Sequence, residues 1–427
     1  MCERTHLMAL LAMIILSGTV TGQDNYNTTL VGHWAGDSCY AVDVSGNIAY
    51  FGDGLYLEII DISDPANLVE LGRIGTPSSA RGIAVSGSYV YVANGVDGLR
   101  IIDVSIPSSP QEVSFLDVAI MVTDVAVSGN YAYVTDAAGL TVTGGLHIID
   151  VSTPSSPQEV GLFVMGVDDA LAVAVSDSYA YVTGEYNGLQ IIDVSTPSSP
   201  QGVDSFDDTY SCAYGVAVSG SYAYVAYGDS HGLRIFDVSI PSSPQEVVFF
   251  DTDSYSNGVA VSGSYAYVAN DDDGLRIIDV STPSSPQEVG FFGMGGTARV
   301  VAISGSCAYV ADWDDGLYII QNNLIVGTDE NPSLPDSFVL QQNYPNPFNP
   351  LTTISYDLPE ESAVNLTVFD IRGQEITTLL DNVKPPGNYE VQWSGNDQQG
   401  NQVSTGVYFC RFEVGSYSQT IKMVYLR

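Results

Sequence analysis

Short apolar runs of strand length alternate with turn residues along most of the chain, and the pattern repeats. One copy, Gly258–Phe292, contains four such runs: Val259–Ser262, Tyr265–Ala269, Gly274–Val280 and Glu288–Phe292. The runs are rich in β-branched and aromatic residues, and none has the length or period of a helix. The prolines of Thr282–Pro286 stop the third run, because proline lacks a backbone donor and fixes φ. The pattern predicts a four-stranded antiparallel meander.

The aspartate of an Ile-Ile-Asp-Val segment sets the register of the copies. Its positions are Asp61, Asp103, Asp150, Asp193, Asp237 and Asp279, with Gln321 in the seventh place. Within a copy, Tyr265 and Tyr267 point to one face of the sheet while Ala266 and Val268 point to the other, so both faces are apolar. One sheet cannot bury both faces, but a ring of sheets can. We therefore expect an all-β chain whose main part is a seven-bladed β-propeller.

The two ends of the repeat region complement each other. The seventh copy stops after Gly316–Gln321 and lacks a fourth run. Leu30–Trp34, before the first copy, resembles the fourth run Val289–Phe292. We expect this N-terminal strand to complete the last blade and close the ring.

Composition divides the rest of the chain. Residues 1–22 hold a short apolar core followed by small residues, which is typical of a signal peptide. The propeller is expected over 23–324, and 325–337 reads as a linker rich in Asp, Asn, Ser and Pro. Six further strand-length runs within 338–427 predict a small Ig-like β-sandwich. No other stretch is apolar enough to span a membrane, so we expect no transmembrane anchor.

The 427 residues carry a formal net charge of -38, with Lys384 and Lys422 as the only lysines. Such a surface repels phosphate backbones and anionic lipid, so we exclude nucleic acid as a partner. Solubility is the simpler explanation of the charge, while cations, cationic peptides and neutral sugars remain open as ligands.

Cysteine and histidine are too sparse to indicate chemistry. Cys39, Cys212, Cys307 and Cys410 show no metal-ligand spacing, and buried thiols are favoured over a Cys39–Cys307 bridge. The histidines after residue 22 lie in different repeats, and no catalytic triad can be assembled. The repeated aspartate is best explained as a cap on turn amides. We therefore predict a protein that is not an enzyme and needs no cofactor. The alternative is a secreted carbohydrate-active lyase or hydrolase with its site at one channel mouth.

Residues that differ among the copies mark the candidate ligand site. The residue before the first run varies most, and six of its seven forms are candidate ligand-binding groups: Tyr40, Arg81, Thr123, Tyr214, Asn257 and Arg299. If the first run lines the channel, these residues ring one mouth of it. Two arginines in an acidic protein can hold a carboxylate or an acidic sugar, so a surface glycan or peptide is the expected ligand. The simpler alternative is an unconstrained, solvated rim.

Two acidic loops raise the possibility of calcium. Their carboxylates belong to Asp271, Asp272, Asp273, Asp312, Asp314 and Asp315. Carboxylate and carbonyl oxygens suit calcium, but neither loop has the alternating spacing of a dedicated site. Acidic turns without an ion are the favoured interpretation.

Two family resemblances complete the picture. The segments Leu99–Val104 and Leu275–Val280 resemble the repeat of the LVIVD-repeat family, and the resemblance extends over about residues 30–323. It implies a propeller of the kind found in secreted and surface proteins, without assigned chemistry. The C-terminal part resembles the sorting domain of the type IX secretion pathway, with its FlgD-like Ig fold. The features that carry this second resemblance are Tyr344, Pro345, Asn346, Pro347, Phe348, Asn349, Pro350, the Asp370–Gln374 turn, Gly406–Tyr408, Lys422 and Arg427.

The second resemblance implies the route and the partner. It implies passage through the periplasm of a Gram-negative-type bacterium, recognition by the type IX machinery, and release or display at the outer cell surface. The family usually ends in a doubly basic patch, whereas this chain has only Lys422 and Arg427. The sequence as a whole indicates a secreted or surface propeller that acts as a binding or structural module.

Overall fold

The computed structural model describes residues 25–325 and 338–426 with short gaps. The gaps are 119–120, 138–143, 167–168, 186–187, 207–211, 229–231, 341–342, 344–345, 347, 349–350, 359–361, 385–386, 400 and 416. The chain forms two compact units, divided between Ile325 and Val326. The expected signal peptide and nearly all of the expected linker lie outside the described residues. In the described part the regular elements are all strands, and no helix there is suited to crossing a membrane.

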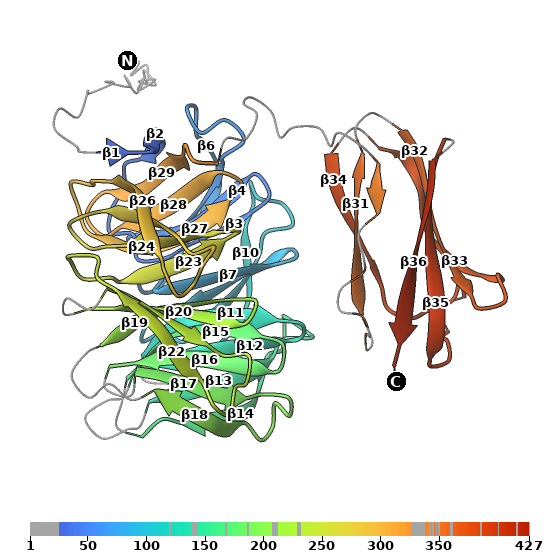
Figure 1. Cartoon of the computed structure of the whole chain (residues 1–427), viewed down its shortest axis with the longest axis horizontal. Helices are drawn as coiled ribbons and strands as arrows, with labels where there is room; N and C mark the ends of the chain where they lie inside the picture. The colour runs from blue at the N-terminus through green and yellow to red at the C-terminus, as the bar shows by residue number, and fades with distance from the viewer. Residues whose placement is uncertain are drawn as a thin grey trace, which may run out of the picture. The chain divides into compact units, whose positions relative to one another are not determined.

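The first unit is a seven-bladed β-propeller, as the repeat pattern predicts (Figure 1). Each blade is an antiparallel meander whose strands follow one another along the chain. Blades 1 to 3 are β3 (Val42–Ser45), β4 (Ile48–Asp53), β5 (Tyr56–Asp61), β6 (Val69–Gly75); β7 (Gly82–Ser86), β8 (Tyr89–Ala93), β9 (Leu99–Asp103), β10 (Gln111–Leu116); and β11 (Val122–Ser128), β12 (Tyr131–Asp136), β13 (Gly145–Asp150), β14 (Gln158–Val164).

Blades 4 to 6 repeat the same arrangement. They are β15 (Ala170–Ser176), β16 (Tyr179–Gly184), β17 (Gly188–Asp193), β18 (Gln201–Phe206); β19 (Ala213–Ser219), β20 (Tyr222–Tyr227), β21 (Gly232–Asp237), β22 (Gln245–Phe250); and β23 (Gly258–Ser262), β24 (Tyr265–Ala269), β25 (Leu275–Asp279), β26 (Gln287–Phe292). Blade 7 supplies only three consecutive strands, β27 (Ala298–Ser304), β28 (Cys307–Asp312) and β29 (Gly316–Asn322).

The N-terminal strand closes the ring, which confirms the expectation from the sequence. Strand β2 (Thr28–Trp34) pairs antiparallel with β29, from Thr28 opposite Asn322 to Trp34 opposite Leu317. A two-residue strand that the sequence did not reveal, β1 (Asn25–Tyr26), pairs with β26 at the outer edge of blade 6. The chain start therefore ties blade 6 to blade 7. The first strand of each blade contacts the first strand of the next, and β27 contacts β3.

Side chains that alternate along one strand enter different interblade cores. Tyr267 packs against blade 7, in a cluster with Val310, whereas its neighbour Val268 packs against blade 5, in a cluster with Tyr224. The paired isoleucines of the third strands, such as Ile277 and Ile278, are completely buried. Burial of each such side chain contributes about 1.5–3 kcal/mol. The ring is thus held together by one apolar core between each pair of adjacent blades.

The repeated aspartate caps the turn that follows the third strand, as expected. Its Oδ1 accepts a hydrogen bond from the amide two residues later, at 2.8 Å from Ser63 to Asp61 and likewise in five further blades. Hydrogen bonds from the serine side chain and amide lower the pKa of Asp61 and of its five equivalents. This aspartate therefore has a structural role in the repeat.

The four described cysteines are free thiols, so the Cys39–Cys307 bridge is not formed. Both residues nevertheless belong to the core between blades 7 and 1. Burial raises the pKa of the Cys39 thiol far above its ordinary range and also raises that of Cys307. They act as small apolar groups at the closure of the ring.

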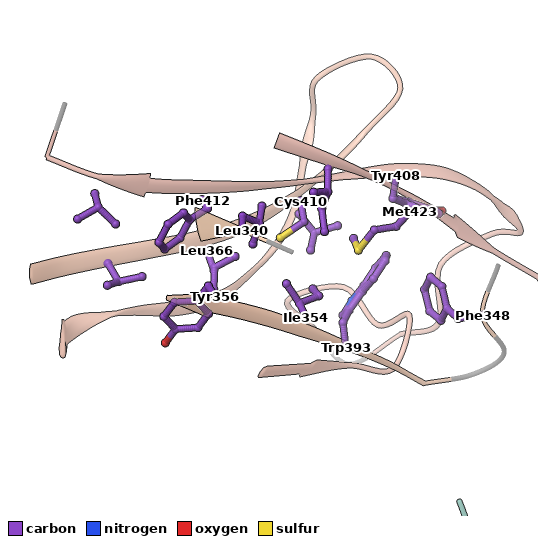
Figure 2. Close-up of a cluster of buried hydrophobic side chains, with 14 of the residues drawn as sticks. Leu340, Phe348, Ile354, Tyr356, Leu366, Trp393, Tyr408, Cys410, Phe412 and Met423 are labelled. Carbon is purple, nitrogen blue, oxygen red and sulfur yellow. The ribbon is translucent and has the colours of Figure 1, made fainter. Parts of the chain in front are cut away.

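The second unit is a two-layer β-sandwich. One layer consists of β30 (Val339–Leu340), β31 (Thr352–Leu358) and β34 (Gly387–Trp393), and the other of β33 (Glu375–Lys384), β32 (Ser362–Asp370), β35 (Gly406–Val414) and β36 (Tyr417–Tyr425). Figure 2 shows the core between the layers, where Ile354, Tyr356 and Trp393 face Leu366, Cys410 and Phe412. The six strand-length runs of the sequence all form strands.

Two described residues of the expected sorting motif hold the last strand of this sandwich. The backbone of Phe348 exchanges hydrogen bonds of 2.9 Å with Val424 and Leu426, and its ring packs between Trp393 and Tyr425. The side chain of Asn346 bonds to the backbone of Lys422 and Val424. Tyr344, Pro345, Pro347, Asn349, Pro350 and Arg427 lie outside the described residues.

Candidate functional site

One face of the propeller carries the segments that vary among the repeats. In an antiparallel blade the start of the first strand, the loop from second to third strand and the connection to the next blade all meet at the same end. We call this end the variable face. It includes the starts of β3, β7 and β27, the loops 94–98 and 312–316, and the connection 76–81. The opposite end has nearly identical glycine turns in most blades, so differences in function are expected on the variable face.

Four side chains from blades 7, 1 and 2 form a continuous row on this face. The guanidinium carbon of Arg299 lies 4.5 Å from the centroid of the Trp313 ring, and that ring lies 5.7 Å from the ring of Tyr40. The guanidinium carbon of Arg81 lies 5.9 Å from the Tyr40 centroid on the other side. We call Arg299, Trp313, Tyr40 and Arg81 the arginine–aromatic row. Three of its members are among the residues expected at the channel mouth, and Trp313 comes from an acidic loop.

Within the part of the chain that the structure describes, the two arginines of the row lack carboxylate partners, in contrast to the other arginines of the propeller. Arg73, Arg100, Arg234 and Arg276 each form ion pairs with Asp or Glu. No described carboxylate lies within 4.0 Å of the charged groups of Arg81 or Arg299. Among the described residues, these two positive charges of a strongly acidic protein therefore have no carboxylate counterion.

A pocket of about 330 Å³ adjoins the Arg81 end of the row. Its walls are Tyr40, Leu55, Pro77, Ser78, Ser79, Arg81, Gly95, Val96 and Met121. Leu55 and Val96 are 54% and 63% exposed at its rim. Apolar walls with a few polar groups and one cation are typical of small-ligand sites. The pocket extends the row from blade 1 across blade 2 towards blade 3.

A buried asparagine holds one wall of the pocket rigid. Asn94 is fully buried, accepts a hydrogen bond of 3.1 Å from the amide of Ser78, and donates to the Ser78 carbonyl oxygen. The hydroxyl of Ser78 donates to Asp97. In blade 6 the equivalent Asn270 accepts hydrogen bonds from the hydroxyls of Thr252 and Ser256 and donates to the Thr252 carbonyl oxygen. A signal for this role was present in the sequence, because Asn94 and Asn270 occupy the same position in two repeats.

The other expected mouth residues, Thr123, Tyr214 and Asn257, contact residues that do not belong to the row. The hydroxyl of Thr123 donates to the Ala170 carbonyl oxygen at 2.6 Å. The amide of Asn257 donates to the Ala298 carbonyl oxygen at 2.9 Å and to Asp271 at 3.2 Å. Tyr214 lies against Gly228 in blade 5. The structure therefore gathers Tyr40, Arg81 and Arg299 at one place and uses Thr123 and Asn257 to connect neighbouring blades.

The acidic loops are engaged in internal contacts. Asp312 is fully buried and accepts the amide of Asp314 at 2.8 Å, and burial raises its pKa. Asp315 accepts the Tyr318 hydroxyl, Asp273 pairs with Arg276, Asp271 binds Asn257, and Asp272 is exposed. Among the described residues, no group of three or more His, Cys, Asp or Glu is arranged to hold a metal ion. The calcium hypothesis thus gains no support from this part of the chain.

A buried histidine lies between two carboxylates in blade 3. The ring of His147 is 3.3 Å from Asp136 and 2.9 Å from Glu159. Burial opposes the charged ring, but the hydrogen bonds and charges of both carboxylates outweigh it and raise the pKa of His147. His147 and Glu159 occupy the places of Arg100 and Glu112 in blade 2, which form an ion pair. This histidine therefore replaces a structural arginine.

Two aspartates that the sequence reasoning overlooked line the ring of first strands. Asp43 accepts the amide of Val85 at 2.8 Å, and Asp124 accepts the amide of Val173 at 3.0 Å, each on the next blade. Burial raises the pKa of Asp124 to about 7 and also raises that of Asp43. Other repeats mostly have alanine or glycine at these positions, which was the available signal. Both aspartates connect adjacent blades.

Comparison with protein families gives the repeat its name. The LVIVD repeat model matches residues 35–76, 77–118, 121–164, 168–208, 212–252, 254–292 and 295–321, which is most of the chain. This chain belongs to the LVIVD-repeat family. The FlgD Ig-like domain model matches residues 350–417, within the sandwich. No curated protein sequence matches the chain.

Two solved structures resemble this LVIVD-repeat protein in fold. The computationally designed Ika8 protein is 12% identical with a TM-score of 0.53, and the match covers 68% of this chain and 99% of that one. PorZ, an essential bacterial surface component of the type IX secretion system of Porphyromonas gingivalis, is 15% identical with a TM-score of 0.51. That match covers 92% of this chain and 60% of PorZ. At these identities the likeness is one of fold alone.

Proposed function

We propose that this LVIVD-repeat protein is an exported binding module whose ligand site is the arginine–aromatic row. The observation that carries the proposal is the pairing pattern of the arginines. All six of the propeller's arginines contact an aromatic ring, but four of them also pair with carboxylates, whereas Arg81 and Arg299 have no carboxylate partner among the described residues. Because the four row residues come from three blades, only a closed ring assembles the site.

Stacking prepares these arginines for an anion. A guanidinium group carries five N–H donors in one plane, which suits bidentate binding of a carboxylate, and contact with an aromatic ring leaves these donors for other partners. The aromatic contact also restricts the side chain, which lowers the entropy lost on binding. The ligand class that fits is a small polar molecule or chain end with a carboxylate, such as a surface glycan or a peptide.

A retention experiment tests this function. The wild-type protein is applied to a broad array of bacterial and host glycans and peptides, beside the double variant Arg81→Ala/Arg299→Ala. The proposal expects the wild type to be retained on a defined group of ligands and the variant to lose at least ten-fold in retention with an unchanged melting transition. Absence of wild-type retention on the whole array, or equal retention of the variant, contradicts the proposal.

The C-terminal sandwich supports delivery to the cell surface by a type IX-like route. Its FlgD-type Ig match, the Asn346 and Phe348 contacts with the last strand, and the fold likeness to a surface component of that system agree with this role. Because the propeller forms its own compact unit, a truncation lacking 338–427 is expected to fold and to remain in the periplasm. Cell fractionation tests this, and normal surface delivery of the truncated protein refutes the sorting role.

Catalysis is the alternative that the structure favours less. One cluster of the described residues that resembles a catalytic group is His33, Tyr318 and Asp315, where the rings of His33 and Tyr318 lie 4.2 Å apart and both side chains contact Asp315. Phe115, Arg100 and Asp97 occupy the equivalent positions of blade 2. There the Arg100 guanidinium lies over the Phe115 ring and pairs with Asp97. Burial and Asp315 raise the pKa of Tyr318, which disfavours its use as a base. We therefore assign this cluster a structural role and propose binding without chemistry.

A further inference from the structure

We infer that the arginine–aromatic row binds an oligosaccharide that carries isolated carboxylates, of the uronic acid type, in preference to a neutral glycan or a densely charged polyanion. This inference rests on the proposed function and specifies its ligand class. It follows from the order of groups along the row, from the pocket at one end, and from the charge of the rest of the protein.

The order of groups along the row is cation, ring, ring, cation. Arg299 and Arg81 lie at the two ends, and Trp313 and Tyr40 lie between them in successive steps of 4.5, 5.7 and 5.9 Å. A single small anion cannot contact both guanidinium groups across two intervening rings. A chain with carboxylates separated by an uncharged unit can bind both, while its middle unit lies over the aromatic pair.

The aromatic pair suits a sugar ring better than a peptide. Trp313 is 38% exposed, so part of its indole ring is open to a ligand. A pyranose ring offers an apolar face of C–H groups for such a surface and hydroxyls for polar groups nearby. An acidic peptide would need partners for its backbone amides, yet the row consists of side chains only.

The pocket at the Arg81 end provides the polar groups. Ser78 and Ser79 line it together with Arg81, and Leu55 and Val96 form an apolar rim. The hydroxyl of Ser78 already donates to Asp97, so its oxygen is oriented to accept from a ligand hydroxyl. The volume of about 330 Å³ lies in the range of small-ligand sites, which fits a terminal sugar unit.

The net charge of the protein limits how anionic the ligand is. Two available guanidinium groups stand against a formal net charge of -38. At physiological ionic strength the attraction of each arginine extends over about 8 Å, so only groups near the row are favoured. A densely sulfated chain would place most of its charges beside acidic surface and be repelled. An oligosaccharide with one carboxylate every second unit avoids this repulsion.

Calorimetric titration with four defined probes tests the inference on the full-length mature protein. The probes are a hyaluronan tetrasaccharide, its carboxyl-reduced neutral counterpart, a heparin tetrasaccharide and an acidic tetrapeptide of alternating Asp and Gly. We expect the hyaluronan tetrasaccharide to bind at least ten-fold more tightly than each of the other three. Single variants Arg81→Ala and Arg299→Ala should each weaken that binding at least five-fold, while Arg276→Ala should leave it unchanged.

Every other outcome contradicts the inferred ligand class, and each has a different consequence for the proposed binding function. If the carboxyl-reduced probe binds equally well, the site recognises glycans without recognising their carboxylates. The proposed binding function is then retained, and the inferred ligand class is rejected. Tighter binding of heparin shows a general polyanion site, and tighter binding of the peptide shows a peptide site. Binding of none of the four rejects the inference, and the array experiment then decides the function separately.

Discussion

The guanidinium of Arg299 lies over the indole ring of Trp313, with its Cζ 4.5 Å from the ring centroid. The ring of Tyr40 also contacts Trp313, with the two ring planes tilted by 41°, although Tyr40 and Trp313 lie near opposite ends of the propeller sequence. This contact exists because closure of the ring brings blade 7 beside blade 1. The candidate binding site is thus a consequence of ring closure.

Substitution of Trp313 should disrupt the contacts of the arginine–aromatic row without unfolding the protein. Trp313→Ala takes the stacking surface from both Arg299 and Tyr40, so we expect glycan affinity to fall at least ten-fold. Because Trp313 is partly exposed, the unfolding free energy should change by no more than about 1 kcal/mol. Affinity and melting temperature are measured together. The matched control is Phe115→Ala, which removes an exposed ring under Arg100 on the outer rim and should leave affinity unchanged.

The buried carboxylate of Asp124 should make the propeller less stable as the pH rises. Burial raises its pKa from 3.8 to about 7, so the native state holds a proton that the unfolded state releases. Stability is therefore lost between about pH 4 and pH 7. Asp124→Asn keeps an acceptor for the Val173 amide and removes the charge. We expect this variant to exceed the wild type by on the order of 1–2 kcal/mol at pH 8 and to equal it at pH 4.5.

Urea unfolding at the two pH values measures this difference. The comparison variant is Asp61→Asn, because hydrogen bonds from Ser63 lower the pKa of Asp61. The ionised form of Asp61 contributes stability above its unfolded pKa and loses it as the pH falls, so this variant should be less stable than the wild type at pH 8. An Asp124→Asn protein that is no more stable than the wild type at pH 8 would contradict the assigned cause.

The N-terminal closure should be sensitive to a single methyl group at Gly32. A Cβ added there would meet the carbonyl oxygen of Pro65 in blade 1 and would lie 3.3 Å from Ile319. The backbone cannot move away without disturbing the β2–β29 pairing, so Gly32→Ala should destabilise the propeller by about 1–3 kcal/mol. Gly295→Ala is the control, because a Cβ there meets no atom within 4 Å. Thermal unfolding of the two variants should separate them clearly.

Phe348 should be a stability residue of the C-terminal sandwich. It is 2% exposed and packs between Trp393 and Tyr425, so Phe348→Ala should cost that domain about 3–5 kcal/mol. Ile371→Ala, at a position 73% exposed, should change stability by less than about 0.5 kcal/mol. Tryptophan fluorescence of Trp393 during denaturation reports on this domain. A Phe348→Ala sandwich as stable as the control would show that the motif residue has no part in the fold.

The sequence predicted the elements that every repeat shares. Strand-length runs, proline stops and the Asp61-type caps recur in nearly identical form, so each copy supports the interpretation of the others. The closing strand β2 was also predictable, because its pattern fits the missing run of blade 7. The two-residue strand β1 was not predictable, since Asn25 and Tyr26 carry no periodic pattern and pair only because the chain passes blade 6.

The candidate site was predictable only in part. Comparison of repeats indicated Tyr40, Arg81 and Arg299 as variable positions, but it treated all six candidate forms of that position as equivalent. Side-chain packing separates them, because Thr123 and Asn257 find backbone acceptors on the next blade. The role of Trp313 was hidden by the aspartates around it. Such contacts depend on the exact placement of neighbouring blades, which spacing along one chain does not give.

The central claim is that Arg81 and Arg299 bind a ligand because they lack partners, and a charge-matched comparison tests it most directly. Arg81→Ala/Arg299→Ala and Arg100→Ala/Arg276→Ala remove the same number of positive charges, the first from the row and the second from partly buried ion pairs at the rim of blades 2 and 6. The affinity of each variant for the hyaluronan tetrasaccharide is measured by calorimetry at physiological salt. The account predicts that the row variant loses measurable binding while the rim variant binds as tightly as the wild type. Equal affinity of the two variants would contradict it.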